Sequence, residues 1–285
     1  MNRKPLFAAA GVCALGAAWY WENRTLSVGE FTVRCGLSSP VRIVSLADLH
    51  GTLFGPRGNT LLSRVRALAP DLIVLPGDTL DASCRNLALT VTLVRRLCAL
   101  APVYMIPGNH ELRSGRAAEL LGRFRAAGAH CLVNERSDGS VRGVPLHILG
   151  LSEGLAVSRL DYLRAALGLV HHADNRTALS ELEQLGGLRL VLSHFPETFA
   201  EIGAFSYGRF HFDLMLCGHA HGGQIRLPGI GGLYAPGQGL LPRYDAGLYR
   251  LTPDGPSLLV SRGLGNDAPI PRIGNRPEIC LVTVL

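Results

Sequence analysis

The chain has 285 residues, of which 47% are hydrophobic and 18% are charged. This composition excludes an intrinsically disordered chain, and 34 glycines without a triplet repeat exclude a collagen-like one. The net charge of +6 favours anionic partners, but the arginines are scattered and form no basic run, so we expect no specific nucleic-acid binding.

The N-terminus contains the only long charge-free apolar run, from residue 5 to residue 21, directly after Arg3 and Lys4. A cleaved secretory signal, an uncleaved membrane anchor and a buried helix are the three interpretations. The run has the minimum length of a membrane span, about 17–25 residues, and ends in Trp and Tyr, which settle at membrane interfaces. We therefore predict a hydrophobic helix that serves as membrane anchor or signal segment over 1–25, and one domain over 26–285. Anchoring would place that domain outside the cytoplasm, and a secreted protein is the alternative.

From residue 41 onward, apolar strand-like runs alternate with helical patterns. The first half predicts strands and helices in the order βαβαβαβ: Val41–Leu46, Thr60–Leu68, Asp71–Leu75, Leu87–Leu100, Val103–Ile106, Arg116–Ala127 and His130–Val133. The second half predicts strands separated by longer turns: Leu146–Leu149, Leu188–Leu192, Asp213–Leu216, Gln224–Leu227, Ser257–Val260 and Ile279–Val284. This order indicates one α/β domain without an internal linker.

Polar residues follow five of the predicted strands directly. They are Asp48 and His50, Asp78, Asn109 and His110, His194, and His219 and His221. One Asp or His after a strand is more often a turn or capping residue, but five such motifs in succession make coincidence a poor explanation. Because ligands bind at the carboxyl ends of strands in open α/β sheets, we expect these side chains to converge.

Nitrogen and oxygen donors without a thiolate suit Mn, Fe, Zn or Co, whereas Mg prefers oxygen ligands alone. One metal ion takes roughly four to six ligands, fewer than the donors available here. Two divalent metal ions that share a bridging carboxylate fit the set better, and such pairs act on both the attacking and the leaving oxygen of a displacement.

These motifs, in this order, resemble the calcineurin-like metallophosphoesterase superfamily over about Val41 to Leu285. The sequence is similar to a branch of small, often membrane-anchored phosphohydrolases, through Phe54-Gly55 after Asp-Leu-His and through the late Ser261-Arg262-Gly263-Leu264-Gly265 motif. The resemblance implies a two-sheet sandwich flanked by helices, in four αββα layers, and commonly manganese, iron or zinc.

By position, the resemblance also implies a role for each residue. A first metal would be held by Asp48, His50 and His221, a second by Asn109, His194 and His219, and both by the bridging Asp78. His110 would not be a ligand but would face the substrate as the general acid.

The resulting hypothesis is a hydrolase that cleaves a phosphate ester through a hydroxide bound to the dinuclear centre. Phosphomonoester, phosphodiester and pyrophosphate substrates all stay open, lipid- and envelope-linked esters among them. The alternative is a non-catalytic module that binds a metal or a phosphorylated ligand, but the intact ligand set argues against it. A nuclease would need a basic stripe with interleaved aromatic residues, which the sequence lacks.

Overall fold

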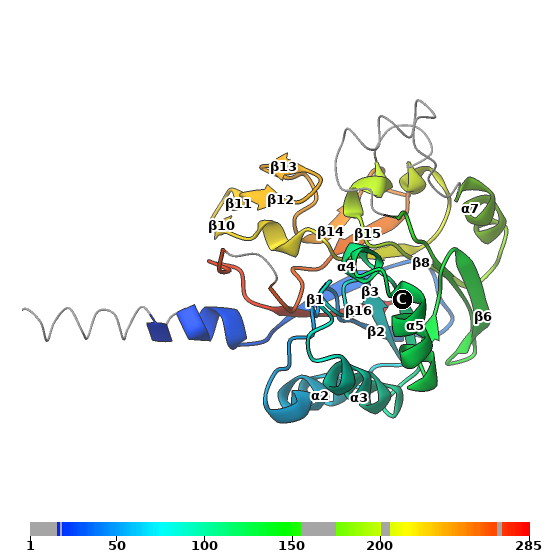
Figure 1. Cartoon of the computed structure of the whole chain (residues 1–285). Coiled ribbons are helices and arrows are strands. Elements are labelled where there is room, and N and C mark those ends of the chain that lie inside the picture. The colour runs from blue at the N-terminus through cyan, green and yellow to red at the C-terminus, as the bar shows by residue number, and fades with distance from the viewer. Residues whose placement is uncertain (1–15, 18, 155–174, 201–205, 267–269) are drawn as a thin grey trace, which may run out of the picture.

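Two mixed six-stranded β-sheets form the centre of the structure, a computed structural model that describes residues 16–17, 19–154, 175–200, 206–266 and 270–285 (Figure 1). The first sheet has the order β1 (Ser27–Val33), β16 (Glu278–Val284), β2 (Val41–Ser45), β3 (Leu72–Pro76), β4 (Val103–Ile106) and β5 (His130–Cys131). The second has the order β14 (Gly247–Arg250), β15 (Ser257–Val260), β9 (Leu214–Cys217), β8 (Leu188–Leu192), β7 (Val144–Gly150) and β6 (Glu135–Val141).

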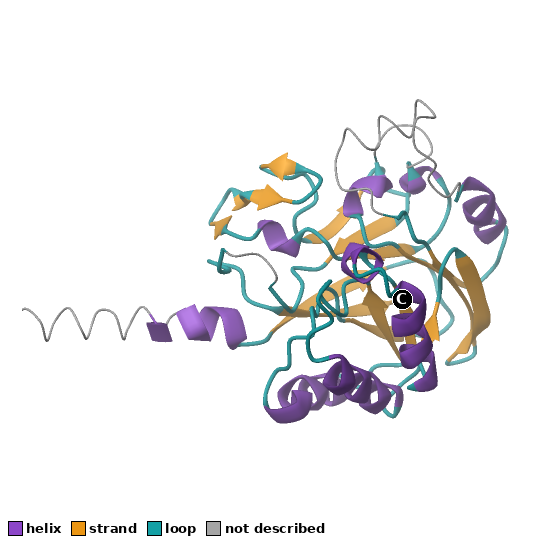
Figure 2. Cartoon of the chain, in the orientation of Figure 1, coloured by secondary structure: helices purple, strands orange, loops and turns teal. Residues whose placement is uncertain are grey.

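Helices cover the outer faces of the sheets (Figure 2). The first sheet packs against α2 (Asn59–Ala67), α3 (Leu87–Cys98) and α5 (Ala117–Ala126), and the second against α7 (Arg176–Glu183). Short elements complete the described chain: α4 (Asn109–Arg113), 3-10 turns at Pro56–Gly58, Pro196–Phe199, Tyr207–Arg209 and His221–Gly223, and two hairpins made of β10 (Arg226–Leu227), β11 (Gly231–Gly232), β12 (Tyr234–Ala235) and β13 (Gly239–Leu240).

Hydrophobic clusters fill the space between the sheets and the spaces under the helices. Along β2, Ile43 packs into the cluster between the two sheets, while its neighbour Val44 packs against the helices of the first sheet. Successive side chains of a strand point to opposite faces, so a strand that is covered on both faces needs apolar residues throughout. The predicted α/β domain with two sheets and flanking helices is therefore confirmed.

The edges of both sheets contain strands that we did not predict. β1 alternates half-buried and exposed residues, and β6 has the sequence ERSDGSV with almost no apolar side chain. Each is an outermost strand of its sheet, so only one of its sides pairs with a neighbour. β1 aligns parallel to β16 from Ser27 to Val33, which adds a strand just after the predicted N-terminal segment.

The predicted membrane anchor is contradicted by the structure. Within the described part of the chain, no helix has both the length and the apolar character that crossing a bilayer requires. Most of the apolar run, residues 5–15 and 18, lies outside the described residues. The described helical residues end instead in the polar Glu22, Asn23 and Arg24.

These last helical residues contact the body of the protein. Glu22 accepts a hydrogen bond from the backbone N–H of Asn275, and Asn23 exchanges hydrogen bonds with the backbone of Arg272. The guanidinium of Arg276 lies 3.7 Å from the centroid of a Trp21 ring. The domain boundary after residue 25 stays a prediction.

Candidate metal centre

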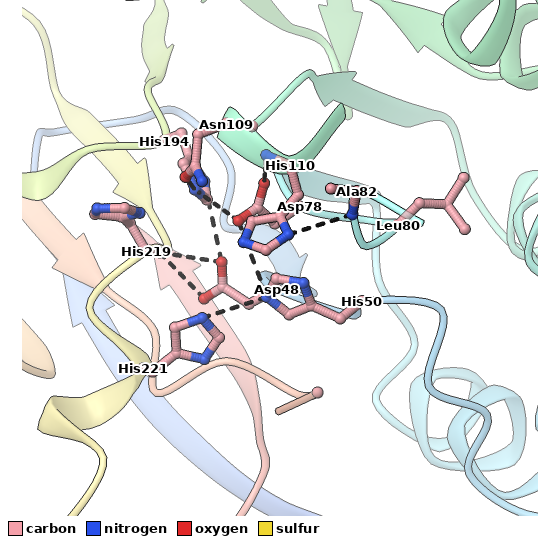
Figure 3. A network of polar contacts seen from close by, with 12 residues as sticks. Asp48, His50, Asp78, Leu80, Ala82, Asn109, His110, His194, His219 and His221 are labelled. Carbon is pink, nitrogen blue, oxygen red and sulfur yellow. Dashed lines mark hydrogen bonds and ion pairs between the residues drawn. The ribbon is translucent and has the colours of Figure 1, made fainter. Parts of the chain in front are cut away.

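Five loops that follow parallel strands meet at one end of the two sheets. Three come from β2, β3 and β4 of the first sheet, and two come from β8 and β9 of the second. These loops carry all eight residues singled out in the sequence: Asp48, His50, Asp78, Asn109, His110, His194, His219 and His221. In Figure 3 the carboxylates of Asp48 and Asp78 lie at the centre, with the imidazoles around them.

The backbone at this site is in an unusual conformation. Asp48, His50, Asp78, His219 and His221 all have φ angles between 46° and 66°, the left-handed region that non-glycine residues rarely adopt. Such residues are under strain and persist only where the surrounding contacts hold them, which is typical of functional sites. The sharp turns aim each side chain inward from the strand end.

Two glycines of the sequence motifs make room for the carboxylates. A Cβ at position 218 would lie 2.6 Å from Oδ1 of Asp48, and a Cβ at Gly108 would also collide with Asp78. Because of this space, the backbone N–H of His219 donates to both oxygens of Asp48 at 3.0 and 3.1 Å. Glycine is thus required at positions 108 and 218 because the carboxylates of Asp78 and Asp48 lie so close to the backbone there.

One group of donors comprises Asp48, His50 and His221. Their potential ligand atoms all lie within 4.8 Å of one another. The two Nε2 atoms of His50 and His221 face each other at 3.3 Å, and the rings are stacked with centroids 5.1 Å apart. The separation allows both nitrogens to reach a common cation.

A second group comprises Asp78, His194 and His219, again with ligand atoms within 4.8 Å of one another. Nε2 of His194 lies 3.1 Å from Oδ2 of Asp78 and 3.1 Å from Oδ1 of Asn109. The other ring nitrogen of His194 lies 2.9 Å from the carbonyl oxygen of Pro76, a contact that orients the imidazole from behind.

Asp78 connects the two groups. The same oxygen, Oδ2, lies 3.1 Å from Nε2 of His194 and 3.9 Å from Nε2 of His50. Its other oxygen, Oδ1, accepts a hydrogen bond of 2.8 Å from the backbone N–H of His110, at the start of α4. The carboxylate is therefore held in place by one oxygen and shared between two clusters by the other.

The two carboxylates differ in their pKa values. Burial would raise the pKa of Asp78, but the adjacent His194 and His50 hold it well below its usual range, so Asp78 is ionised. Burial raises the pKa of Asp48 to about 6, although His194 and the hydrogen bond from His219 oppose this effect. A positive charge near Asp48 would favour its ionised form.

Three of the histidines are held neutral. Burial lowers the pKa of His50 to about 4 and the pKa values of His219 and His221 well below their ordinary range. Neutral imidazole is the form that binds a metal ion. His194 differs: burial would lower its pKa, but the charge of Asp78 raises it to about 10.

A further observation shows that the donor set fits metal ions. Nε2 of His219 is buried and has no hydrogen-bond partner. A buried polar atom that stays unsatisfied costs about 1–3 kcal/mol, and natural proteins leave few of them. An unsatisfied imidazole nitrogen next to converging carboxylates fits a metal ligand.

A sequence profile of the calcineurin-like phosphoesterase family matches residues 41–223. The chain belongs to this family. The match spans all five loops and includes all eight residues singled out in the sequence. Together with the donor clusters, it shows that the chain is a metal-dependent hydrolase of phosphate esters with two divalent metal ions.

The chain is also similar to individual proteins. The phosphodiesterase YaeI of Escherichia coli is 28% identical over 255 residues, which cover 87% of this chain and 83% of the relative. An uncharacterized metallophosphoesterase of Aquifex aeolicus is 27% identical and covers 95% and 96% of the two chains. Among solved structures, a dimetal phosphatase from Danio rerio aligns with a TM-score of 0.48 at 14% identity, over 79% of this chain and 88% of the other.

Sequence reasoning missed the role of two buried residues. Arg272 is 1% exposed; its guanidinium donates to the carbonyl oxygens of Gly265 and Arg262 and lies 3.3 Å from Nδ1 of His221. Burial lowers its pKa to about 10. No local sequence signal indicates that an arginine fifty residues after His221 supports that ring.

Glu111 is the second, and it positions the loops rather than facing the substrate. Its carboxylate is fully buried and accepts hydrogen bonds from the backbone N–H groups of Asp78 at 3.1 Å, Leu80 at 2.8 Å and Gly108 at 2.9 Å. Burial, followed by the charge of Asp78, raises its pKa to about 8. Its place three residues after Gly108 is the spacing of a capping box, a signal available in the sequence.

We expect Glu111→Ala to lower the stability by about 3 kcal/mol, because three buried N–H groups lose their acceptor. Metal affinity should fall by about 10- to 100-fold, as for other residues that support ligands. Urea unfolding and calorimetric metal titration measure the two effects. The control is Glu119→Ala, which removes an exposed glutamate paired with Arg116 and Arg123 and should leave stability and metal affinity close to those of the wild type. Wild-type metal affinity in Glu111→Ala would refute the positioning role.

Glu153 lies behind the site, where it accepts a hydrogen bond of 2.5 Å from Oγ of Ser193. Burial raises its pKa from near 4.5 to about 7, against the effect of that hydrogen bond. The folded state therefore binds this proton more tightly than the unfolded state does. The resulting stabilisation is complete below about pH 4.5 and is lost as the pH rises to about 7.

We expect Glu153→Gln to remove this pH dependence, because the amide keeps an acceptor for Ser193 without a charge. Between pH 5 and pH 8, the variant should lose on the order of 2 kcal/mol less stability than the wild type. Urea unfolding of both proteins at the two pH values measures the difference. Parallel losses in the two proteins would show that Glu153 is not the group responsible.

Proposed function

We propose that the protein hydrolyses a phosphate diester at a centre where two divalent cations share Asp78. The observation that carries this proposal is the position of Asp78 Oδ2 between the two donor groups, 3.1 Å from His194 and 3.9 Å from His50. One carboxylate oxygen within reach of both groups is the arrangement that a pair of cations requires.

In this proposal the remaining donors divide between the two cations. Asp48, His50 and His221 hold one cation, and Asn109, His194 and His219 hold the other. The division is supported by two of the three groups of ligand atoms and by the contact of Asn109 with His194; the third group joins His110 to His50 and Asp78. Two cations and two carboxylates leave a net charge of +2, which attracts an anionic phosphate.

Cations bound there supply Lewis acidity toward a phosphoryl oxygen and lower the pKa of a bound water. The chain itself supplies the proton for the leaving oxygen, through His110. The backbone N–H of Ala82 donates to Nδ1 of His110 at 3.3 Å, so in the neutral imidazole the proton is on Nε2. His110 lies edge-on against His50, with ring centroids 4.7 Å apart, and is half-buried, so that it borders the centre without being enclosed in it.

The choice of a diester is supported by the E. coli relative, which is named a phosphodiesterase. A phosphomonoester and a pyrophosphate are the competing substrates. The test compares hydrolysis of bis-p-nitrophenyl phosphate, p-nitrophenyl phosphate and a pyrophosphate by the full chain with added Mn²⁺, together with the metal content of the protein.

We expect metal-dependent hydrolysis, highest for the diester, and about two metal ions for each chain. Faster hydrolysis of the monoester or the pyrophosphate would change the substrate class. A protein that binds the metal but hydrolyses none of the three would support a non-catalytic binding module.

A further inference from the structure

A cavity of about 270 Å³ lies directly beside the proposed metal centre. His221 is one of its lining residues and also belongs to the donor group with Asp48 and His50. The other lining residues come from the segment that follows His221, from the β12 region and from Ile270. In Figure 1 the hairpins β10 to β13 project at the upper left of the molecule. The cavity therefore borders the centre at the side chain of His221.

The walls of this cavity are mostly apolar. Besides the aliphatic and ring surfaces of Ile225, Leu233 and Pro236, they include Tyr234 and Ile270. Tyr234 is 53% exposed and Ile270 is 52% exposed, so both keep apolar surface in contact with water at the opening. Covering such surface is favourable, and clustered exposed apolar residues next to a polar site are typical of ligand binding.

A polar network holds the walls in place. Asp245 accepts hydrogen bonds from Arg226 at 2.8 Å and from the backbone N–H of Gly232 at 2.6 Å, and Arg226 also donates to the carbonyl of Gly222. On the opposite side, Nε2 of Gln224 donates to the carbonyl oxygen of Ile270. The cavity is thus formed before any ligand binds, which avoids an ordering cost on binding.

We propose that this cavity binds the hydrocarbon chain of one ester group of the substrate. The substrate is then a phosphate ester of an apolar alcohol. The proposal rests on the proposed phosphoesterase function, since a phosphorus atom at the centre places one substituent beside His221. The volume suffices, because a cavity of about 150 Å³ lined by apolar side chains accommodates benzene. A polar or charged alcohol would lose its hydration in such a cavity without gaining hydrogen bonds.

The experiment uses the metal-loaded full chain and a series of alkyl p-nitrophenyl phosphates from methyl to hexyl. We expect kcat/KM to rise with chain length, by up to about fourfold for each buried methylene, until the cavity is full. A second readout does not depend on turnover. Hexylphosphonate should raise the melting temperature of the same protein more than methylphosphonate does at equal concentration.

Variants locate the effect. Tyr234→Ser and Ile270→Ser should each lower the hexyl-to-methyl ratio of kcat/KM by about tenfold, since each removes a large part of the apolar wall. The matched control is Ile230→Ser, which alters a residue that is 62% exposed and does not line the cavity. Its ratio should equal that of the wild type.

The outcomes separate this inference from the proposed function. Metal-dependent hydrolysis that does not change with chain length overturns the cavity assignment alone. A chain-length preference that survives in both lining variants also overturns it, because the alkyl group would then bind elsewhere. If no ester is hydrolysed, the proposed function fails, and the phosphonates still decide the cavity: equal shifts in melting temperature refute it.

Discussion

Asp78→Asn is expected to lower metal-dependent ester hydrolysis by at least about 10³-fold, the largest loss we predict for a single substitution. An asparagine keeps the size of the side chain and the acceptor for the N–H of His110, but it loses the negative charge that His194 and His50 face. An amide oxygen is also a poor bridge between two cations. The variant should bind one metal ion or none where the wild type binds two.

The measurement combines kcat/KM on bis-p-nitrophenyl phosphate with elemental analysis of the purified variant. The matched control is Asp254→Asn, the same chemical change at an exposed position far along the chain from the strand-end motifs. We expect wild-type activity and metal content there. Two tightly bound metal ions and near-normal turnover in Asp78→Asn would contradict the shared carboxylate and, with it, the assignment of the other ligands.

The central part of the fold could be predicted because its strands are buried on both faces. Such strands are continuous apolar runs, and β4, β8 and β15 have the bounds expected from their sequences. The edge strands β1 and β6 could not be predicted in this way. β6 pairs with β7 along seven residues, yet its side chains are mostly polar, because a backbone ladder on one side holds it and the core does not need its side chains.

The candidate ligands could be predicted because each follows a buried strand, and the loops that carry them converge in the structure. What the sequence could not reveal is the support behind them. The role of Arg272 depends on its burial and on its contact with the ring of His221. The capping-box spacing of Glu111 does not indicate its hydrogen bonds with the distant N–H groups of Asp78 and Leu80. Of the N-terminal predictions, the membrane anchor was wrong, and hydropathy could not indicate that Glu22 and Asn23 bond to the body. The signal segment stays a prediction.

His110→Gln is the second large effect, and its size should depend on the leaving group. His110 holds its proton on Nε2 because the N–H of Ala82 occupies Nδ1, and a glutamine has no proton to transfer. Loss of a general acid costs about 10²- to 10⁴-fold where the departing oxygen must be protonated. A p-nitrophenolate leaves without that proton, so its ester should lose far less activity than an ester of an aliphatic alcohol.

The measurement is kcat/KM for two diesters, one with a p-nitrophenyl and one with an alkyl leaving group, in the wild type and in His110→Gln. The variant should keep its metal content, since the ligand groups of Asp48 and His194 do not depend on this ring. Equal losses on both substrates would mean that His110 stabilises charge on the phosphoryl group instead of donating a proton. An unequal loss accompanied by a missing metal ion would instead make His110 a ligand, because its ring also lies within 4.8 Å of donor atoms of His50 and Asp78. The contrast between leaving groups therefore tests the direction of proton transfer, and the metal content separates it from a structural role.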